Sequence, residues 1–240
     1  MTDDARLVRL RRPPQLVRIA ERFVPRVPLD AVERRWDALR AANLRYFDGD
    51  ILHVLGQSRN GYGGVTIHVA VTSYRFYAVQ RPGLDGSGGG PIDCGVRPLG
   101  AKGITRCDGK FAMARRSESV AFYPHEWEFV PGGGLEPDDD AASCVLRELQ
   151  EETGLEAIGA PIAVGLLFDP GALSWEVVHH IEARSIAGRA FVSPAAAHAW
   201  EHGDRRLIAP GAWPEPMCPI ARTMLELLPD DLGPRGASDR

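Results

Sequence analysis

Hydrophobic periodicity in the first third of the chain predicts one helix and two strands. Val32, Trp36 and Leu39 recur at helical spacing within "DAVERRWDALRAAN" (30 to 43). The apolar runs "ILHVLG" (51 to 56) and "VTIHVAVT" (65 to 72) predict strands. "SYRFYAVQ" (73 to 80) either continues the second strand or begins a helix, and we favour the helix because Ser73 can cap it.

After residue 95, strand patterns alternate with helix patterns, which predicts an α/β fold around a mixed sheet. Two strands flank Cys107-Asp108-Gly109, where Asp-Gly tolerates the positive φ angles of a tight hairpin. The further expected strands are "EWEFV" (126 to 130), "IAVGLLF" (162 to 168) and "WEVVHHIEA" (175 to 183). Helices are expected at 141 to 153, near 193 to 203 and near 218 to 228.

A loop rich in glycine and proline, "RPGLDGSGGGP" (81 to 91), divides these two parts. It lacks the GK[ST] ending of a phosphate-binding P-loop, so a linker is the better interpretation. We therefore expect an N-terminal α/β extension at residues 1–94 and a main domain at 95–229. The last segment, 230–240, has the composition of a disordered tail.

The segment "GGLEPDDDAASCVLRELQEETGL" (133 to 155) carries the candidate chemistry. Asp140 is placed to cap a helix, and Gly154 is placed to end it. Residues three and four apart share a helix side, so Glu148, Glu151 and Glu152 project together. A second, apolar stripe would dock the helix on the core, and its members are Ala142, Val145, Leu146 and Leu149.

Converging carboxylates are the ligands that a hard divalent cation such as Mg²⁺ prefers. The alternative for an isolated acidic run is a solvated helix face paired with Arg147. Like charges at helical spacing cost a few tenths of a kcal/mol per pair, so a bound cation would explain why the chain keeps them together.

At this point the sequence resembles the Nudix hydrolases, whose motif is G, five residues, E, seven residues, then REUxEExGU with U aliphatic. Eight of the nine specified positions match: Gly133, Arg147, Glu148, Leu149, Glu151, Glu152, Gly154 and Leu155. Asp139 departs from the motif glutamate, and we interpret it as a tolerated change because it keeps the charge. "HEWEFVPGGG" (125 to 134) resembles the preceding W-E-x-P-G-G, but one extra residue follows Glu128, so we carry no role over to it.

The resemblance implies an α/β/α sandwich and hydrolysis of a nucleoside diphosphate linked to another group. It also implies that Glu148, Glu151 and Glu152 hold Mg²⁺, or Mn²⁺ in its place, and that Arg147 orients a glutamate. The Gly132-Gly133 turn would leave backbone room beside them.

The general base is left open by the sequence. Glu148 is our first choice and Glu201, in "AWEHGD", the second. His179, His180 and His202 could also serve, although histidine in a strand or at a helix end is more often structural.

The substrate is indicated by weaker resemblances. "DPGALSWEVVHHIEA" (169 to 183), with Pro170, is similar to the "SPG…E…" segment of ADP-ribose pyrophosphatases, and three other segments resemble UDP-glucose-hydrolysing Nudix proteins. Arg115 and Arg116 are candidate phosphate or base contacts, unless they form a solvent-facing pair. We favour UDP-sugars over ADP-ribose. The competing interpretations are a nucleoside triphosphate pyrophosphatase and a non-catalytic nucleotide-sugar sensor.

Composition narrows the expected partners. The formal net charge of −4 argues against a general nucleic-acid surface, so we expect a small-molecule nucleoside diphosphate derivative, and a homodimer is compatible with the sequence. No apolar run is long enough for a membrane span, which favours a cytoplasmic location. The four cysteines form no CxxC pair, so buried free thiols are expected.

Overall fold

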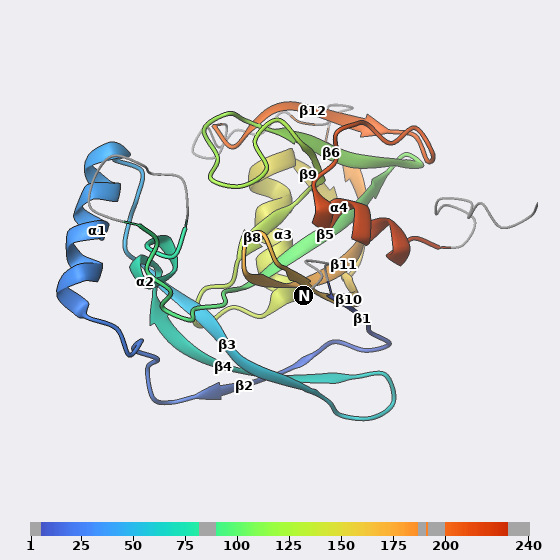
Figure 1. Cartoon of the computed structure of the whole chain (residues 1–240). Coiled ribbons are helices and arrows are strands. Elements are labelled where there is room, and N and C mark those ends of the chain that lie inside the picture. The colour runs from blue at the N-terminus through green and yellow to red at the C-terminus, as the bar shows by residue number, and fades with distance from the viewer. Residues whose placement is uncertain (1–5, 82–89, 187–190, 192–199, 230–240) are drawn as a thin grey trace, which may run out of the picture.

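Two β-sheets organise the computed structural model, which describes residues 6–81, 90–186, 191 and 200–229 (Figure 1). The larger sheet runs in the order β1 (Arg6–Arg9), β10 (Ile162–Asp169), β11 (Ser174–Ser185), β5 (Leu99–Cys107), β6 (Lys110–Arg116) and β12 (His202–Ile208). Three short strands extend it, namely β7 (Trp127–Phe129) beside β6, β8 (Gly132–Gly134) beside β5, and β9 (Leu155–Ala157) beside β11. β11 and β5 pair in parallel and the remaining pairs of this sheet are antiparallel, so the predicted mixed sheet is confirmed.

Helices cover both faces of this sheet. In β11, Val177 packs in the same core cluster as Val145 and Leu149 of helix α3 (Ala141–Thr153). The next residue, Val178, packs in a second cluster with helix α4 (Pro219–Met224) and the 3-10 helix η2 (Leu225–Leu227). Successive strand residues point to opposite faces, so α3 and α4 lie on opposite sides, as in the expected α/β/α sandwich.

The smaller sheet has the order β2 (Gln15–Ile19), β4 (Val65–Ser73) and β3 (Asp50–Arg59). It lies below the larger sheet in Figure 1, with helix α1 (Leu29–Ala42) at the left edge. The predicted helix after β4 is confirmed as α2 (Tyr74–Ala78), but Ser73 does not cap it. The Ser73 hydroxyl instead donates to Asp48 at 2.5 Å.

The predicted hairpin between β5 and β6 is confirmed. Asp108 and Gly109 have φ angles of 50° and 75°, the left-handed values that a two-residue hairpin turn needs. The helix expected near 193 to 203 falls mostly on 192–199, outside the described residues, and the structure corrects its end. His202 already begins strand β12, because it pairs with Arg116 of β6.

Both expected caps of α3 are confirmed. The Asp140 side chain accepts a hydrogen bond from the Ser143 N–H at 2.7 Å, and Gly154 ends the helix with φ 66°. Of the expected apolar stripe, Val145 and Leu149 are buried, whereas Ala142 and Leu146 are partly exposed. The buried face is shifted toward Cys144, Glu148 and Glu152, which brings two of the acidic residues into the interior.

The first segment of the chain packs against the main part. β1 forms the edge of the larger sheet, with Arg6 opposite Phe168. Leu52 and Ile67 of the smaller sheet belong to the same core cluster as Leu149. The division into an extension and a main domain stays a prediction, but these contacts join the two parts through one apolar core. No described helix is both long and apolar enough to cross a membrane.

The Asp140 cap should contribute measurably to stability. Asp140→Ala removes an acceptor from the first turn of α3 and should lower the free energy of unfolding by about 1 kcal/mol. Urea denaturation followed by circular dichroism measures this change. Asp138→Ala, an exposed neighbour in the same loop, is the matched control. Equal losses in the two variants would contradict the capping role.

Candidate active site

Two acidic residues on α3 are buried. Glu148 is 8% exposed and Glu152 is 3% exposed, while Glu151 is half-buried. Burying a carboxylate is costly unless opposite charge or hydrogen bonds compensate it. The surroundings of these two side chains therefore decide what the site can bind.

Arg147 supplies part of the compensation for Glu148. Its guanidinium donates to Glu148 Oε1 at 2.7 Å and to Asp139 Oδ2 at 3.0 Å. Arg147 thus holds the Glu148 carboxylate in one orientation while Asp139 holds Arg147. Asp139, which departs from the motif glutamate, is long enough to make this ion pair.

Glycine at position 133 allows a close approach between β8 and α3. A Cβ atom placed there would lie 2.4 Å from Glu148 Oε1 and 2.5 Å from its Cδ. A Cβ at the next residue, Gly134, would meet nothing within 4 Å. The backbone room expected from the sequence is therefore present, and at Gly133 it is needed by Glu148.

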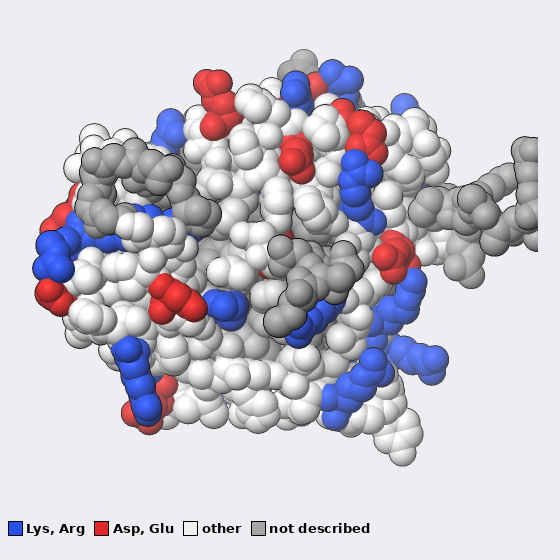
Figure 2. All heavy atoms as spheres, viewed as in Figure 1, with Lys and Arg blue, Asp and Glu red and all other residues white. Residues whose placement is uncertain are grey.

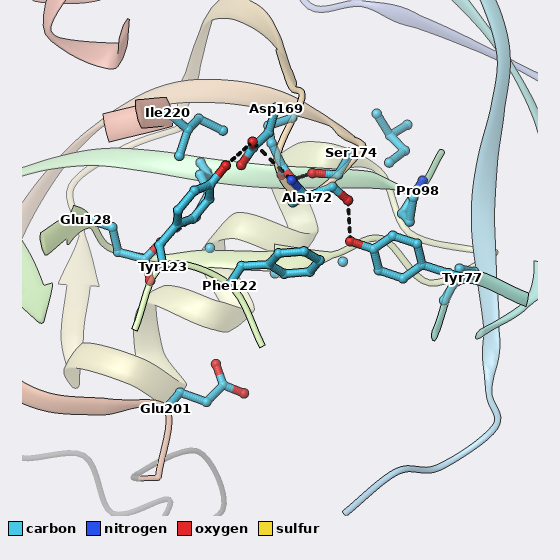
Figure 3. Close-up of a pocket in the computed structure, with 18 of the residues that line it drawn as sticks. Tyr77, Pro98, Phe122, Tyr123, Glu128, Asp169, Ala172, Ser174, Glu201 and Ile220 are labelled. Carbon is cyan, nitrogen blue, oxygen red and sulfur yellow. Dashed lines mark hydrogen bonds and ion pairs between the residues drawn. The ribbon is translucent and has the colours of Figure 1, made fainter. Parts of the chain in front are cut away.

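A cavity of about 420 Å³ opens beside these residues (Figure 3). Glu148 and the glycines of β8 line one part of the cavity. Lys102 of β5 and Glu176 of β11 line the adjoining part. The rest of the wall comes from the loop at 122 to 123, from 169 to 174, and from Tyr74, Tyr77 and Arg81 of the N-terminal segment.

A buried charge cluster faces the cavity at Glu128. The Glu128 carboxylate accepts a hydrogen bond from Lys102 Nζ at 2.8 Å and another from Arg116. It also lies 3.1 Å from His202 Nε2. Burial by itself would raise the pKa of Glu128, but the charges of Lys102 and Arg116 hold that pKa well below its usual range. Glu128 is therefore a permanent anion that fixes two cations at the cavity wall.

Glu152 is in the opposite situation. Burial raises the pKa of Glu152 well above its usual range, and the carboxylates of Glu128, Glu148 and Glu201 raise it further. Its Oε2 atom is buried and has no hydrogen-bond partner. A cation bound at this oxygen would stabilise the charged form of Glu152 and so lower its pKa.

Glu176 on β11 also faces the cavity. Burial raises the pKa of Glu176 to about 7, although Lys102 and a hydrogen bond from the Ser174 hydroxyl at 2.7 Å oppose the increase. The pairing partner of Glu176 in β5 is Gly100, where a Cβ would lie 2.3 Å from Glu176 Oε2. A side chain that titrates near neutral pH can exchange protons with a substrate.

The segment after α3 closes the far wall of the cavity. Asp169 accepts from the Tyr123 hydroxyl at 2.6 Å and from the Gly171 N–H at 2.9 Å. The Tyr77 hydroxyl donates to the Ala172 carbonyl at 2.6 Å, so the N-terminal segment is fastened to the same turn (Figure 3).

Only some of the residues predicted from the sequence line the cavity. Glu148, Arg116 and Glu201 line the cavity, whereas Arg115 and Pro170 are not in its lining. Arg115 is exposed and donates to the His125 carbonyl at 2.8 Å.

The three candidate histidines lie outside the cavity lining as well. His179 is buried in β11, and burial lowers its pKa to about 4. Burial likewise lowers the pKa of His180. His202 is buried against Glu128. Their positions agree with a structural role for all three.

Sequence reasoning missed three residues of the site, which are Lys102, Glu128 and Glu176. Each is a charged residue with a nonpolar neighbour on both sides in its strand, and that is the signal that could have identified them. The sequence does not reveal that β5 and β11 are parallel neighbours, so it could not bring Lys102 and Glu176 together.

The donors present fit a hard divalent cation. Glu148, Glu151 and Glu152 offer carboxylate oxygens, and the Glu152 oxygen without a hydrogen-bond partner is available for coordination. Across the described ranges, no three His, Cys, Asp or Glu side chains already converge at metal-binding spacing. Glu148 is directed to Arg147 instead, so binding would require its carboxylate to turn.

Comparisons with known proteins agree with this site. The NUDIX domain model matches residues 98–204. An RNA pyrophosphohydrolase of Acidiphilium cryptum (strain JF-5) is 42% identical over 50 residues, which are 21% of this chain and 30% of that protein. The m7GpppN-mRNA hydrolase NUDT17 of Xenopus laevis is 39% identical over 64 residues, 27% of this chain and 20% of that protein. The chain thus matches less than a third of the length of either relative.

Solved structures include a similar chain, a MutT NUDIX hydrolase from Burkholderia pseudomallei. It has a TM-score of 0.45 and 20% identity, over 55% of this chain and 98% of that one. The family match covers the glycine strand, the capped acidic helix and the part of the cavity wall that lies between residues 98 and 204, and it shows that residues 98–204 of this chain form a NUDIX domain.

Proposed function

We propose that the protein is a Mg²⁺-dependent hydrolase that cleaves the diphosphate linkage of a nucleoside diphosphate sugar into a nucleoside monophosphate and a sugar phosphate. One observation carries the proposal. Buried Glu148 lines a cavity whose wall also holds Lys102 and Arg116, and on the same helix buried Glu152 has an oxygen that lacks a hydrogen-bond partner. This combination suits an anionic substrate bound together with a cation.

Glu148, Glu151 and Glu152 would hold the metal, with Mn²⁺ as a substitute for Mg²⁺. When bound, a divalent ion supplies Lewis-acid stabilisation of phosphate oxygens and activates water. The described residues do the remaining work. Arg147 holds the Glu148 carboxylate in one orientation through the 2.7 Å hydrogen bond.

Lys102 and Arg116 share one carboxylate, Glu128, so the three side chains together present one net positive charge at the cavity wall. A negatively charged phosphate oxygen can form an ion pair with this group. Because Glu128 fixes both cations, little conformational entropy is lost when they bind a substrate.

Three carboxylates of the site are candidates for the group that accepts a proton from the attacking water. Glu148 is the first candidate and Glu201 the second, and both line the cavity. Glu176 is a third, since its pKa of about 7 lets it change protonation state near neutral pH.

The wall of the cavity supports a sugar rather than additional phosphates. Asp169, Ser174 and Glu176 offer hydrogen-bonding groups for sugar hydroxyls in the cavity wall. A nucleoside triphosphate would place extra negative charge beside these acidic groups. The nucleotide-sugar hydrolase is therefore preferred to a triphosphate pyrophosphatase.

RNA 5′ ends are the second candidate substrate, because the two curated relatives are named for RNA pyrophosphate and mRNA cap hydrolysis. Against RNA, the formal net charge is −4, and most of the face in Figure 2 is uncharged, with blue and red side chains mainly around its rim. A non-catalytic sensor is disfavoured because all three motif glutamates are kept. A cytoplasmic location and a homodimer stay predictions from the sequence.

A substrate panel tests the proposal. With Mg²⁺ present, UDP-glucose or UDP-galactose should give UMP and a sugar 1-phosphate with the highest kcat/KM, and ADP-ribose should be next. Product chromatography would follow these compounds together with nucleoside triphosphates, triphosphorylated RNA and capped RNA. Faster turnover of a triphosphate or of an RNA would overturn the nucleotide-sugar assignment.

Removing the charge of Glu152 should abolish most activity. Glu152→Gln keeps the shape of the side chain but removes an anionic ligand, so kcat should fall at least ~10²-fold while the fold is retained. Initial rates and circular dichroism measure the two effects. Activity within twofold of the parent would exclude Glu152 as a metal ligand.

The close approach at Gly133 offers a geometric test. Gly133→Ala would push the Glu148 carboxylate aside and should lower kcat by at least about tenfold, because a small displacement of a catalytic group is costly. Gly134→Ala, which meets no neighbouring atom, is the matched control and should be active. Similar rates in both variants would show that the position of Glu148 is not critical.

A further inference from the structure

A second cavity of about 610 Å³ adjoins the first one. The two cavities share four lining residues, Ile51, Tyr74, Arg81 and Glu201, so they meet at these side chains and are together called the cleft. Four aromatic residues line the second cavity, namely Tyr46, Phe47, Trp200 and the shared Tyr74.

Most of the second cavity comes from the N-terminal segment. Residues 43–51, Tyr74 and Arg81 precede the stretch that the NUDIX model matches. The remaining wall comes from residues 119–121 and from Trp200 and Glu201. The N-terminal segment therefore adds to the cleft a compartment of a different chemical character.

Two arginines that line the second cavity lie over aromatic rings. The Arg45 guanidinium is 4.8 Å from the centre of the Trp200 ring. The Arg81 guanidinium is 5.5 Å from the ring of Tyr74, which lines both cavities, and it is 4.5 Å from the Tyr77 ring and 4.8 Å from the Phe122 ring, which line the first cavity. Flat guanidinium groups and aromatic rings both offer faces on which another planar group can stack.

Arg81 differs from Arg116, the other arginine that lines the first cavity. Arg116 pairs with Glu128. Within the described part of the chain, no Asp or Glu forms an ion pair with Arg81, and its buried Nε atom has no hydrogen-bond partner. The positive charge of Arg81 is therefore not neutralised by a carboxylate of the described residues. It can pair with an anionic ligand at the junction of the two cavities.

We propose that the second cavity is the nucleoside subsite. The nucleobase stacks among Tyr46 and Trp200, and Arg81 contacts the adjoining phosphate, while the sugar occupies the polar wall of the first cavity. This inference rests on the proposed hydrolysis of a nucleoside diphosphate sugar. It assigns each end of that substrate to one compartment.

The two compartments favour this orientation over the reverse one. A nucleobase gains from stacking on aromatic rings, and each stacked base is typically worth about 1–3 kcal/mol in alanine substitutions. Sugar hydroxyls gain from paired donors and acceptors such as Asp169, Ser174 and Glu176, which lie in the first cavity only.

The test compares a substrate that has a base with one that lacks it. Initial rates of parent and variants are measured with UDP-glucose and with methyl diphosphoglucose, in which a methyl group replaces the nucleoside. Trp200→Ala should reduce the preference for UDP-glucose about tenfold, mainly through KM. Arg81→Gln should lower kcat/KM for both compounds, because both contain the phosphate that Arg81 contacts. A preference unchanged in Trp200→Ala would overturn the subsite.

Tyr62→Ala is the matched control, since Tyr62 is an aromatic residue of the same segment that is 94% exposed and lines neither cavity. It should keep the parental preference. A binding experiment separates this inference from the proposed reaction. Saturation-transfer NMR of UMP with Glu152→Gln should show the uracil protons in contact with protein, and the added Trp200→Ala change should remove that signal.

The binding result is informative even if the parent hydrolyses no nucleotide sugar. Uracil contact that depends on Trp200 would then support the subsite and reject only the reaction. Absence of uracil contact, or contact that persists without Trp200, would overturn the subsite whatever the enzyme hydrolyses.

Discussion

Burial of like-charged carboxylates is the constraint on which the rest of the site depends. Glu128, Glu148 and Glu152 all lie in the interior, and Glu201 adds its charge nearby. The chain compensates two of them, Glu128 through Lys102 and Arg116, and Glu148 through Arg147. Glu152 has no comparable partner, and its raised pKa shows that the protein alone does not stabilise its charged form.

The fold brings these charges together from separate strands and one helix. α3 presents the motif glutamates, β5 and β6 bring Lys102 and Arg116, and β7 brings Glu128. The glycines of β8 let the sheet and helix approach closely enough for Glu148 to face the cavity. The N-terminal segment then completes the cleft through Tyr77 and Arg81, and Tyr77 is fastened to the turn after β10.

Local signals in the sequence predicted the elements well and the site only in part. The caps at Asp140 and Gly154 and the Asp108-Gly109 turn depend on neighbouring residues, so their chemistry is readable from the chain. Lys102 and Glu176 meet only because β5 and β11 pair in parallel, a long-range fact that no local pattern contains. Arg115 and Arg116 look equivalent in sequence, but strand alternation sends only Arg116 to the cavity. The contribution of the N-terminal segment was the largest feature that sequence reasoning could not supply. The place of its strands beside the NUDIX domain follows from the packing of a shared apolar core.

The central claim is that Glu152 needs a bound cation to be stable as an anion. The pKa of Glu152 is higher in the folded protein than in the unfolded chain, where it is about 4.5. Without metal, the parent should therefore lose stability as the pH rises from about 4.5 toward the pKa of the folded protein. The direct measurement is the unfolding midpoint at pH 7.5, with EDTA or with excess Mg²⁺, for the parent and for Glu152→Gln. Mg²⁺ should raise the midpoint of the parent and have little effect on the variant, whereas the variant should be the more stable protein in EDTA. Equal responses to Mg²⁺, or a parent that is the more stable in EDTA, would contradict the account.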